Sequence, residues 1–209
     1  MNISAIIPVK TFSKAKSRLD LPTDVKTELC KLMFDEVLNT LSTSPIINKI
    51  IVVSKDEEAL SISKKYNAVS IIDQNESGVN NAVAQADKYL VENNFTASIV
   101  FPQDIPFIKS QDIDFLLKFL SYPTCSLVVP SRKFDGTNAL LRMPVDLMET
   151  HYDEDSYKIH LETAKSKTPN WSLVFVRRIM MDIDANDDLQ YCISQNEKPN
   201  VCEKISKLL

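Results

Sequence analysis

Two aspartates separated by one residue form the clearest chemical signal in this sequence, in the segment Asp182-Ile183-Asp184. Residues 180–183 have the apolar composition of a strand, and residues i and i+2 of a strand face the same side. Two carboxylates on one face repel each other unless water screens them or a cation lies between them. Mg²⁺ typically uses one or two protein carboxylates together with substrate phosphates. The pair therefore favours a magnesium site, with a solvent-exposed strand face as the alternative.

A third carboxylate, Asp104, lies in the segment Pro102-Gln103-Asp104-Ile105-Pro106. It follows residues 98–101, an apolar run with the length of a buried strand. The flanking prolines restrict the backbone and so fix the direction of the acid. A turn-capping Asp would fit the same pattern. Together with the Asp182/Asp184 pair, however, Asp104 is better explained as a third ligand of one divalent cation.

The first expected strand is followed by a basic segment in an acidic chain. Lys10, Lys14, Lys16 and Arg18 place four positive charges within nine residues, while the whole chain has a net charge of −4. Such a local positive field suits a triphosphate, which Lys binds as a point charge and Arg through two donors. The segment lacks the glycines of a Walker loop, and a solvated basic loop is the alternative. The acidic balance of the chain argues against a nucleic-acid partner.

Gly78 and Gly136 are the only glycines in the chain, so each is expected where the backbone needs a positive φ or a close approach. Gly78-Val79-Asn80 opens an expected helix and could border a nucleotide, although ordinary helix-entry chemistry explains it as well. Gly136-Thr137-Asn138 could bind an oxyanion through backbone N–H groups, or form a hairpin-like turn. Both segments are therefore candidate ligand-binding turns.

An alternation of apolar runs and amphipathic segments must position these groups. The expected strands are 3–9, 50–53, 69–72, 98–101, 126–129, 138–141, 172–176 and 180–183. The expected helices are 24–41, 54–66 (opened by a capping box at Ser54), 80–91, 112–120, 144–149, 156–165, 187–194 and 201–208. This order predicts a single α/β domain over residues 1–209, a Rossmann-like three-layer α/β/α fold with a mostly parallel sheet. Ligands of such sheets bind beyond the carboxyl ends of the strands, where the charged segments fall.

Several functional classes are excluded or disfavoured. The four cysteines form no CxxC pair, and no GxSxG or HExxH motif is present. His151 and His160 are isolated, and for each a surface or capping role is expected. No apolar run approaches the ~18 residues of a membrane span, so a cytoplasmic protein is expected. Phosphoryl-group transfer needs no nucleophile–base pair, because a phosphate monoester with a second pKa near ~6 is already an anion at neutral pH.

Six segments together resemble one family, the 2-phospho-L-lactate guanylyltransferases of coenzyme F420 biosynthesis. They occur in the family's order and cover nearly the whole chain. The PVK…AKSRL and GTNALL segments are fairly specific, whereas DIP and DID are shared more widely among nucleotidyltransferases. The matching segments are Ile7-Pro8-Val9-Lys10…Ala15-Lys16-Ser17-Arg18-Leu19, Gly78-Val79-Asn80, Pro102-Gln103-Asp104-Ile105-Pro106, Gly136-Thr137-Asn138-Ala139-Leu140-Leu141, Ser156…His160 and Asp182-Ile183-Asp184.

The resemblance implies a fold similar to that of the MobA-like nucleotidyltransferases. It implies transfer of GMP from GTP to 2-phospho-L-lactate or phosphoenolpyruvate, with release of pyrophosphate, assistance by Mg²⁺ and a possible homodimer. Carried over by position, Lys10, Lys16 and Arg18 would hold the GTP phosphates, Gly78 and Asn80 would border the nucleoside, Asp104, Asp182 and Asp184 would bind metal, and Thr137, Asn138 and Ser156 would bind the phospho-acid. Catalytic roles would fall to Lys10, Lys16, Arg18 and Asp104.

One segment departs from the family pattern. Where the family usually has F-G-P-x-S, this chain has Tyr152-Asp153-Glu154-Asp155-Ser156. An acidic loop beside an anionic substrate is electrostatically unfavourable, so the identity of the acceptor stays open at this point. One alternative is another MobA-like or sugar-phosphate nucleotidyltransferase, although those carry a glycine-rich loop after the first strand. The other is a non-catalytic GTP-binding protein.

Overall fold

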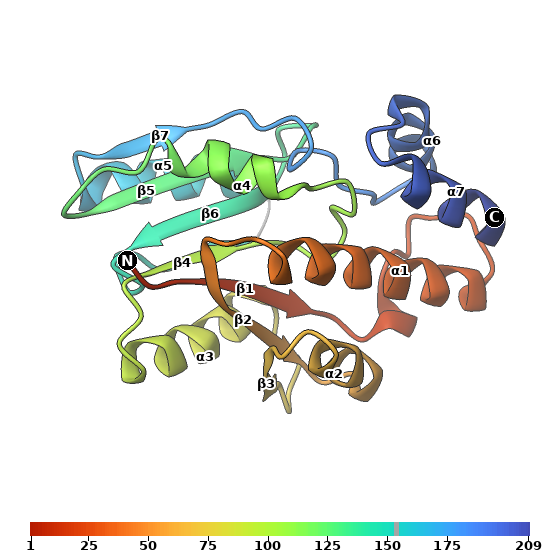
Figure 1. The fold of residues 1–209 in the computed structure, drawn as a ribbon, viewed down its shortest axis with the longest axis horizontal. Coiled ribbons are helices and arrows are strands. Elements are labelled where there is room, and N and C mark those ends of the chain that lie inside the picture. The colour runs from red at the N-terminus through yellow and green to blue at the C-terminus, as the bar shows by residue number, and fades with distance from the viewer. Residues whose placement is uncertain (153–154) are drawn as a thin grey trace.

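A computed structural model describes residues 1–152 and 155–209, and in these residues seven strands form one sheet (Figure 1). The strand order across the sheet is β3-β2-β1-β4-β6-β5-β7. The strands are β1 (Ile3–Val9), β2 (Ile47–Ser54), β3 (Val69–Ile72), β4 (Ala97–Val100), β5 (Cys125–Pro130), β6 (Thr137–Met143) and β7 (Trp171–Leu173).

The sheet is mostly parallel, as the sequence predicts, with one reversed strand. β1 runs parallel to β2 and β4, β2 to β3, and β5 to β7, whereas β6 runs antiparallel to both β4 and β5. The reversed strand therefore begins at the edge where its neighbours end. This direction places Thr137, the first residue of β6, beside the carboxyl ends of β4 and β5.

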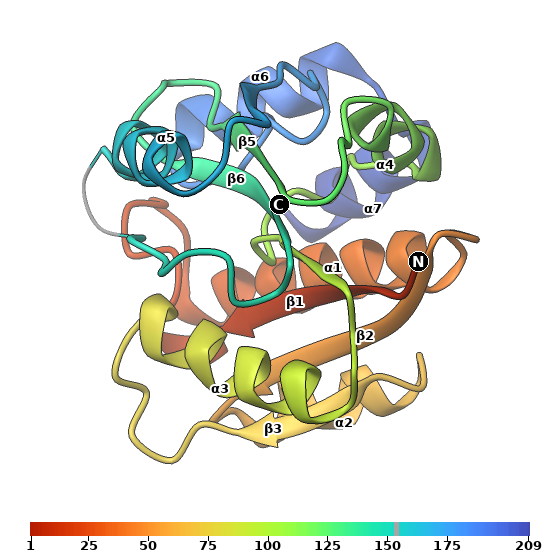
Figure 2. The same cartoon turned by 90° about the vertical axis from the view of Figure 1, so that its left-hand side faces the viewer.

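Helices cover both faces of the sheet (Figure 2). Along β1, Ile6 faces the core under α3 and α5, while Ala5 and Ile7 face the core under α1, α2, α4, α6 and α7. Strands buried on both sides are expected where crossover helices lie on both faces. The helices are α1 (Thr23–Ser42), α2 (Glu57–Lys64), α3 (Val79–Glu92), α4 (Ser110–Leu117), α5 (Ser156–Lys167), α6 (Asn186–Gln195) and α7 (Pro199–Leu208), with a short 3₁₀ helix at Phe12–Lys14.

Two predicted elements are wrong. Residues 144–149 form a turn closed by one hydrogen bond, from Leu147 N–H to the Pro144 carbonyl, and not a helix. Residues 180–183 join no strand ladder, because the chain turns at 177–180 and the Ile183 N–H donates to the Asp104 carbonyl at 3.1 Å. In both places some apolar side chains, Val145 and Met148 in the first and Met181 and Ile183 in the second, are buried without a regular element.

Other predicted boundaries shift, two of them for visible reasons of hydrogen bonding or strand pairing. The seventh strand ends at Leu173 instead of residue 176. The helix predicted from residue 54 begins at Glu57, because the side chain of Asp56, and not Ser54, accepts hydrogen bonds from the first turn of α2. The Ser54 hydroxyl instead donates to the Val9 carbonyl at 2.9 Å. The other predicted strands and helices overlap elements of the structure.

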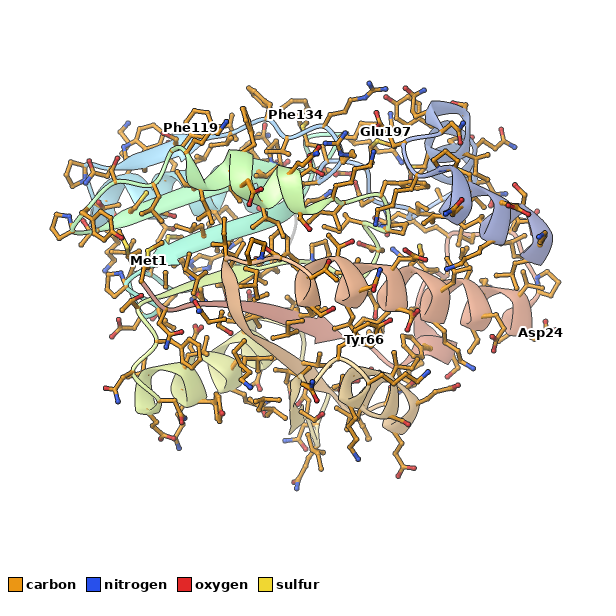
Figure 3. The ribbon with its side chains drawn as sticks, viewed as in Figure 1. Met1, Asp24, Tyr66, Phe119, Phe134 and Glu197 are labelled. Carbon is orange, nitrogen blue, oxygen red and sulfur yellow. The ribbon has the colours of Figure 1, made fainter. Side chains whose placement is uncertain are left out.

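One arginine holds the turn that precedes the aspartate pair. Arg178 donates to both carboxylate oxygens of Asp112 in α4, at 2.6 and 2.8 Å, and to Glu197 at 3.2 Å. Glu197, labelled in Figure 3, lies in the connection between α6 and α7. The segment that leads to Asp182 is therefore fixed by contacts from two sides. None of the described helices is both long enough and apolar enough to cross a membrane.

Candidate active site

The loop after β1 is anchored by Thr11 and Phe12, which lie between Lys10 and Lys14 in the sequence. The ring of Phe12 is buried and lies 5.9 Å from the ring of Phe34, and the Phe12 N–H donates to Asp56 at 2.9 Å. One residue earlier, the Thr11 N–H donates to Glu76 at 2.6 Å. These contacts bring the loop against α1, α2 and the loop after β3. The backbone of Lys16 then adopts a left-handed conformation, with φ of 55°.

Lys16 lies between two of the three predicted metal ligands. Its ammonium group donates to Asp104, and to Asp184 at 2.5 Å, and its side chain is only 5% exposed. Burial alone would lower the pKa of Lys16, but the charges of Asp104 and Asp184 more than offset this effect and raise the pKa. The ammonium group therefore stays charged and neutralises the acidic cluster.

Two hydrogen bonds position the aspartates, one between backbone groups and one from a side-chain amide. The hydrogen bond from the Ile183 N–H to the Asp104 carbonyl joins the two acidic segments, and Asn138 Nδ2 donates to Asp182 at 3.0 Å. Burial, followed by the charge of Asp104, raises the pKa of Asp182 to about 6. Among the described residues, no set of three or more His, Cys, Asp or Glu side chains forms a ready-made metal site.

Two adjoining cavities open at this edge of the sheet. The first, about 550 Å³, is lined by Lys10, Lys16 and Gly78, together with the ends of β1 and β4. The second, about 770 Å³, lies over the start of β6. Both cavities are lined by Pro102, Asp104, Thr137, Tyr152 and Asp184. The acidic cluster therefore lies where the two cavities meet.

The predicted site residues divide between the two cavities. Lys10, Lys16 and Gly78 line the first. Arg18, which the resemblance placed on the GTP phosphates, lines the second cavity with Asn138, Ser156 and Asp182. Gly78 has a φ of 103°, and a Cβ there would meet nothing within 4 Å, so the backbone conformation and not close contact calls for glycine.

Asn80 and the acidic loop differ from the other predicted positions. The Asn80 side-chain oxygen accepts a hydrogen bond from the Tyr152 N–H at 2.8 Å, and Asn80 is not among the described residues that line either cavity. Its contact positions the chain before α5. Asp155 is exposed, lines the second cavity and has a φ of 56°. Asp153 and Glu154, the rest of the acidic loop, lie outside the described residues.

Several residues that line the cavities were not among the predicted site residues. Asp73 and Glu76 line the first cavity, Gln103 lines it beside Asp104, and Tyr152 lines both. Among the described atoms, Gln103 Oε1 and the Tyr152 hydroxyl are buried without a hydrogen-bond partner. Gln103 adjoins Asp104 in sequence, which is a usable signal, whereas nothing local distinguishes Tyr152 from a core aromatic residue.

His160 is completely buried, against the expectation of a surface or capping role. Its Nε2 accepts a hydrogen bond from the His151 N–H at 2.8 Å, and its Nδ1 lies 2.9 Å from the Thr137 hydroxyl oxygen. Burial, followed by the charges of His151 and Arg142, lowers the pKa of His160 to about 3. The ring is therefore neutral in the folded protein.

The lowered pKa predicts a loss of stability in acid. Below the ordinary pKa of 6.5 the unfolded chain takes up a proton at His160 that the folded chain refuses until about pH 3, so stability falls with pH across this window. The slope due to this group is at most ~1.4 kcal/mol per pH unit. Asp182, with its raised pKa, has the opposite slope between its unfolded value of 3.8 and about 6. The effect must therefore be measured as a difference between proteins.

Urea unfolding of the wild type and of His160→Asn between pH 7 and pH 4 isolates the histidine contribution. The wild type is expected to lose its advantage over the variant progressively below about pH 6.5. Parallel stability curves for the two proteins would contradict a neutral, buried His160.

Comparisons with known proteins find similarity along nearly the whole chain. A family model described as "Guanylyl transferase CofC like" matches residues 3–207. The phosphoenolpyruvate guanylyltransferase of Conexibacter woesei is 30% identical over 192 residues, which cover 90% of this chain and 86% of that protein. The 2-phospho-L-lactate guanylyltransferase of Methanocaldococcus jannaschii is 31% identical over 191 residues, which cover 90% and 81%.

Solved structures at low sequence identity share the fold. A protein described as a nucleotide-diphospho-sugar transferase, from Desulfovibrio desulfuricans G20, superimposes with a TM-score of 0.76 at 14% identity, covering 100% of this chain and 97% of that chain. The 4-diphosphocytidyl-2C-methyl-D-erythritol synthase of Anaerococcus prevotii gives a TM-score of 0.66 at 12% identity, with 94% and 96% covered. The predicted fold class is therefore confirmed.

Proposed function

Because the chain belongs to the CofC-like guanylyltransferase family and is a nucleotidyltransferase, we propose that it transfers GMP from GTP to a three-carbon phospho-acid and releases pyrophosphate. The product, lactyl-2-diphospho-5′-guanosine or its enolpyruvyl analogue, serves coenzyme F420 biosynthesis. One observation carries the proposal: two cavities adjoin and share Asp104 and Asp184. A two-substrate transfer needs two binding sites that meet at the reacting phosphorus.

The first cavity has the groups that a nucleoside triphosphate needs. Lys10 and Lys16 supply positive charge, and Gly78 precedes the N-terminus of α3, which favours anions. In the proposal, Lys16 leaves its contacts with the two carboxylates when GTP binds and holds a phosphate oxygen. Asn80 acts indirectly, through its hydrogen bond to the Tyr152 N–H.

The second cavity suits the acceptor. Thr137, Asn138 and Ser156 line it with hydroxyl and amide groups, and Arg18 supplies a guanidinium. A guanidinium binds carboxylate and phosphate oxygens through two parallel donors. We therefore place Arg18 on the phospho-acid, with the Thr137 hydroxyl as a donor to it. Asn138 and Ser156 line the same cavity and position its walls, because Asn138 donates to Ile179 and Asp182 and Ser156 donates to Thr137.

The acidic cluster fits a divalent cation. Asp104 Oδ1 is buried without a hydrogen-bond partner among the described residues, and oxygen ligands are those that Mg²⁺ prefers. Asp104, Asp182 and Asp184 would hold the ion together with substrate phosphate oxygens, because the carboxylates of the described residues alone form no metal site. When bound, such an ion neutralises charge on the phosphates.

The reaction needs little acid–base chemistry from the protein. The phosphate of the acceptor is already an anion at neutral pH, attacks the α-phosphorus of GTP and displaces pyrophosphate in one step. The side chains at the junction of the cavities align the two substrates, and Lys16 offsets charge on the phosphates during the displacement. The phosphate oxygen becomes the bridging oxygen of the new diphosphate.

The acceptor is tested by direct competition. Protein, GTP and Mg²⁺ are mixed with equal amounts of 2-phospho-L-lactate and phosphoenolpyruvate, pyrophosphate is measured, and the product masses are read by mass spectrometry. We expect pyrophosphate release and a product from 2-phospho-L-lactate in excess over the enolpyruvyl product. Pyrophosphate release with neither acid would reject the acceptor class, and GTP binding without turnover would favour a non-catalytic protein.

A further inference from the structure

The geometry around His160 points to a role in acceptor binding that the fold alone does not require. We propose that His160 is a positioning residue that forces the Thr137 hydroxyl to donate its hydrogen bond into the acceptor cavity. The inference rests on the proposed function, because the acceptor is an anion whose oxygens only accept hydrogen bonds.

The contacts of His160 define which of its ring nitrogens carries the hydrogen. The His151 N–H can only donate, and it points to Nε2 at 2.8 Å. A nitrogen that accepts a hydrogen bond carries no hydrogen, so the hydrogen of the neutral ring must be on Nδ1. The contact with His151 therefore sets the tautomer, and Nδ1 donates a hydrogen bond to the Thr137 hydroxyl oxygen at 2.9 Å.

The Thr137 hydroxyl can accept no further hydrogen bond and is left with one to donate. A hydroxyl oxygen accepts two hydrogen bonds and donates one. The Thr137 oxygen accepts from His160 and also from the Ser156 hydroxyl, at 3.1 Å. Both acceptor positions are then filled, and its own hydrogen is left for a partner elsewhere. Because Thr137 lines both cavities, that partner is a substrate oxygen.

Packing holds Thr137, Ser156 and His160 in place. Ser156 and His160 are one turn apart on α5, so both reach the same side of the helix and the first residue of β6. The ring of Tyr152 lies edge-on to His160, with 4.8 Å between the ring centres. Thr137, Ser156 and His160 are all at most 6% exposed, so water does not compete for these hydrogen bonds. The hydroxyl is thereby aimed before the acceptor arrives.

The kinetic test separates this role from a merely structural one. His160→Leu removes the N–H while nearly filling the space, and Thr137→Val removes the hydroxyl. Each is expected to raise KM for 2-phospho-L-lactate about tenfold while KM for GTP stays unchanged, since one hydrogen bond to a charged group is lost. The double variant is expected to be no worse than Thr137→Val, because His160 acts through Thr137.

A conservative variant provides the rescue. In His160→Asn the amide N–H can occupy the place of Nδ1, so KM for the acceptor is expected to stay within about threefold of wild type. Equal increases in the KM of both substrates, or losses that multiply in the double variant, would overturn the proposal. ¹⁵N NMR of the imidazole nitrogens must show hydrogen on Nδ1 and none on Nε2; the opposite tautomer would also overturn it.

A binding measurement distinguishes failure of this inference from failure of the proposed function. Calorimetry with 2-phospho-L-lactate, on protein saturated with an α,β-methylene analogue of GTP, needs no turnover. The same tenfold loss of affinity is expected in His160→Leu and Thr137→Val. Absent pyrophosphate release by the wild type would refute the reaction, whereas unchanged or absent acceptor binding in this series would refute the role of His160.

Discussion

Asp104→Asn is expected to reduce kcat/KM by roughly 30- to 1,000-fold, which corresponds to a loss of about 2–4 kcal/mol of transition-state stabilisation. The carboxylate lies where the two cavities meet, contacts Lys16, and has one buried oxygen without a partner among the described residues. Asn keeps the size of the side chain but not its charge. The variant therefore loses the negative group that organises cations around the reacting phosphates.

Folding should survive this substitution. Burial raises the pKa of Asp104, which means that the folded protein holds the charged form at a cost. The backbone carbonyl that accepts from the Ile183 N–H is unaffected. The unfolding temperature is therefore expected to fall only modestly, because the buried Lys16 ammonium loses one partner but keeps its contact with Asp184. Asp187→Asn, an exposed aspartate at the start of α6, is the matched control and should keep full activity. Full activity in Asp104→Asn would refute the assigned role.

Lys16→Met is expected to lower kcat/KM by about 100- to 1,000-fold, the cost of removing one charged group from a phosphate clamp. The ammonium group is the buried cation of the acidic cluster, and its raised pKa shows how strongly the two carboxylates hold it. Lys16→Arg should restore little, because a planar guanidinium does not fit the place of a compact ammonium.

Steady-state assays with GTP and each acid measure this loss, and Lys64→Met in the exposed last turn of α2 is the matched control. A second readout follows from charge alone. With Lys16 absent, Asp104 and Asp184 repel each other, so Mg²⁺ without nucleotide should raise the unfolding temperature more in Lys16→Met than in the wild type. No added response to Mg²⁺, together with normal activity, would contradict the position of Lys16 in the cluster.

The side chains that line the two cavities were easier to predict than the elements that carry them. Asp182 and Asp184 were identified from their spacing on a supposed strand, yet residues 180–183 pair with no strand. One contact that positions them is the hydrogen bond from the Ile183 N–H to the Asp104 carbonyl, between segments far apart in sequence. Apolar periodicity reports burial, and burial here does not require a ladder.

The other residues whose roles were not predicted make their contacts with residues distant in sequence. His160 contacts Thr137 across 23 positions, and Asn80 contacts Tyr152 across 72. No local pattern distinguishes such residues from core or capping ones. By contrast, the 69–72 strand and the helix over 24–41 were predicted well, because a run of apolar residues or a repeat of three and four is a local property.

The contacts of Arg178 extend the active region beyond the cavities. This side chain joins α4 and the connection between α6 and α7 to the turn that leads to Asp182. No described residue of α7 lines either cavity. Nevertheless, damage to the C-terminal helices would remove contacts that position the aspartates, and the two reactants would then be misaligned. Truncation or proteolysis there would therefore cut turnover, and it would also lower the stability of the fold, because α7 buries Val201, Cys202 and Ile205 in the core.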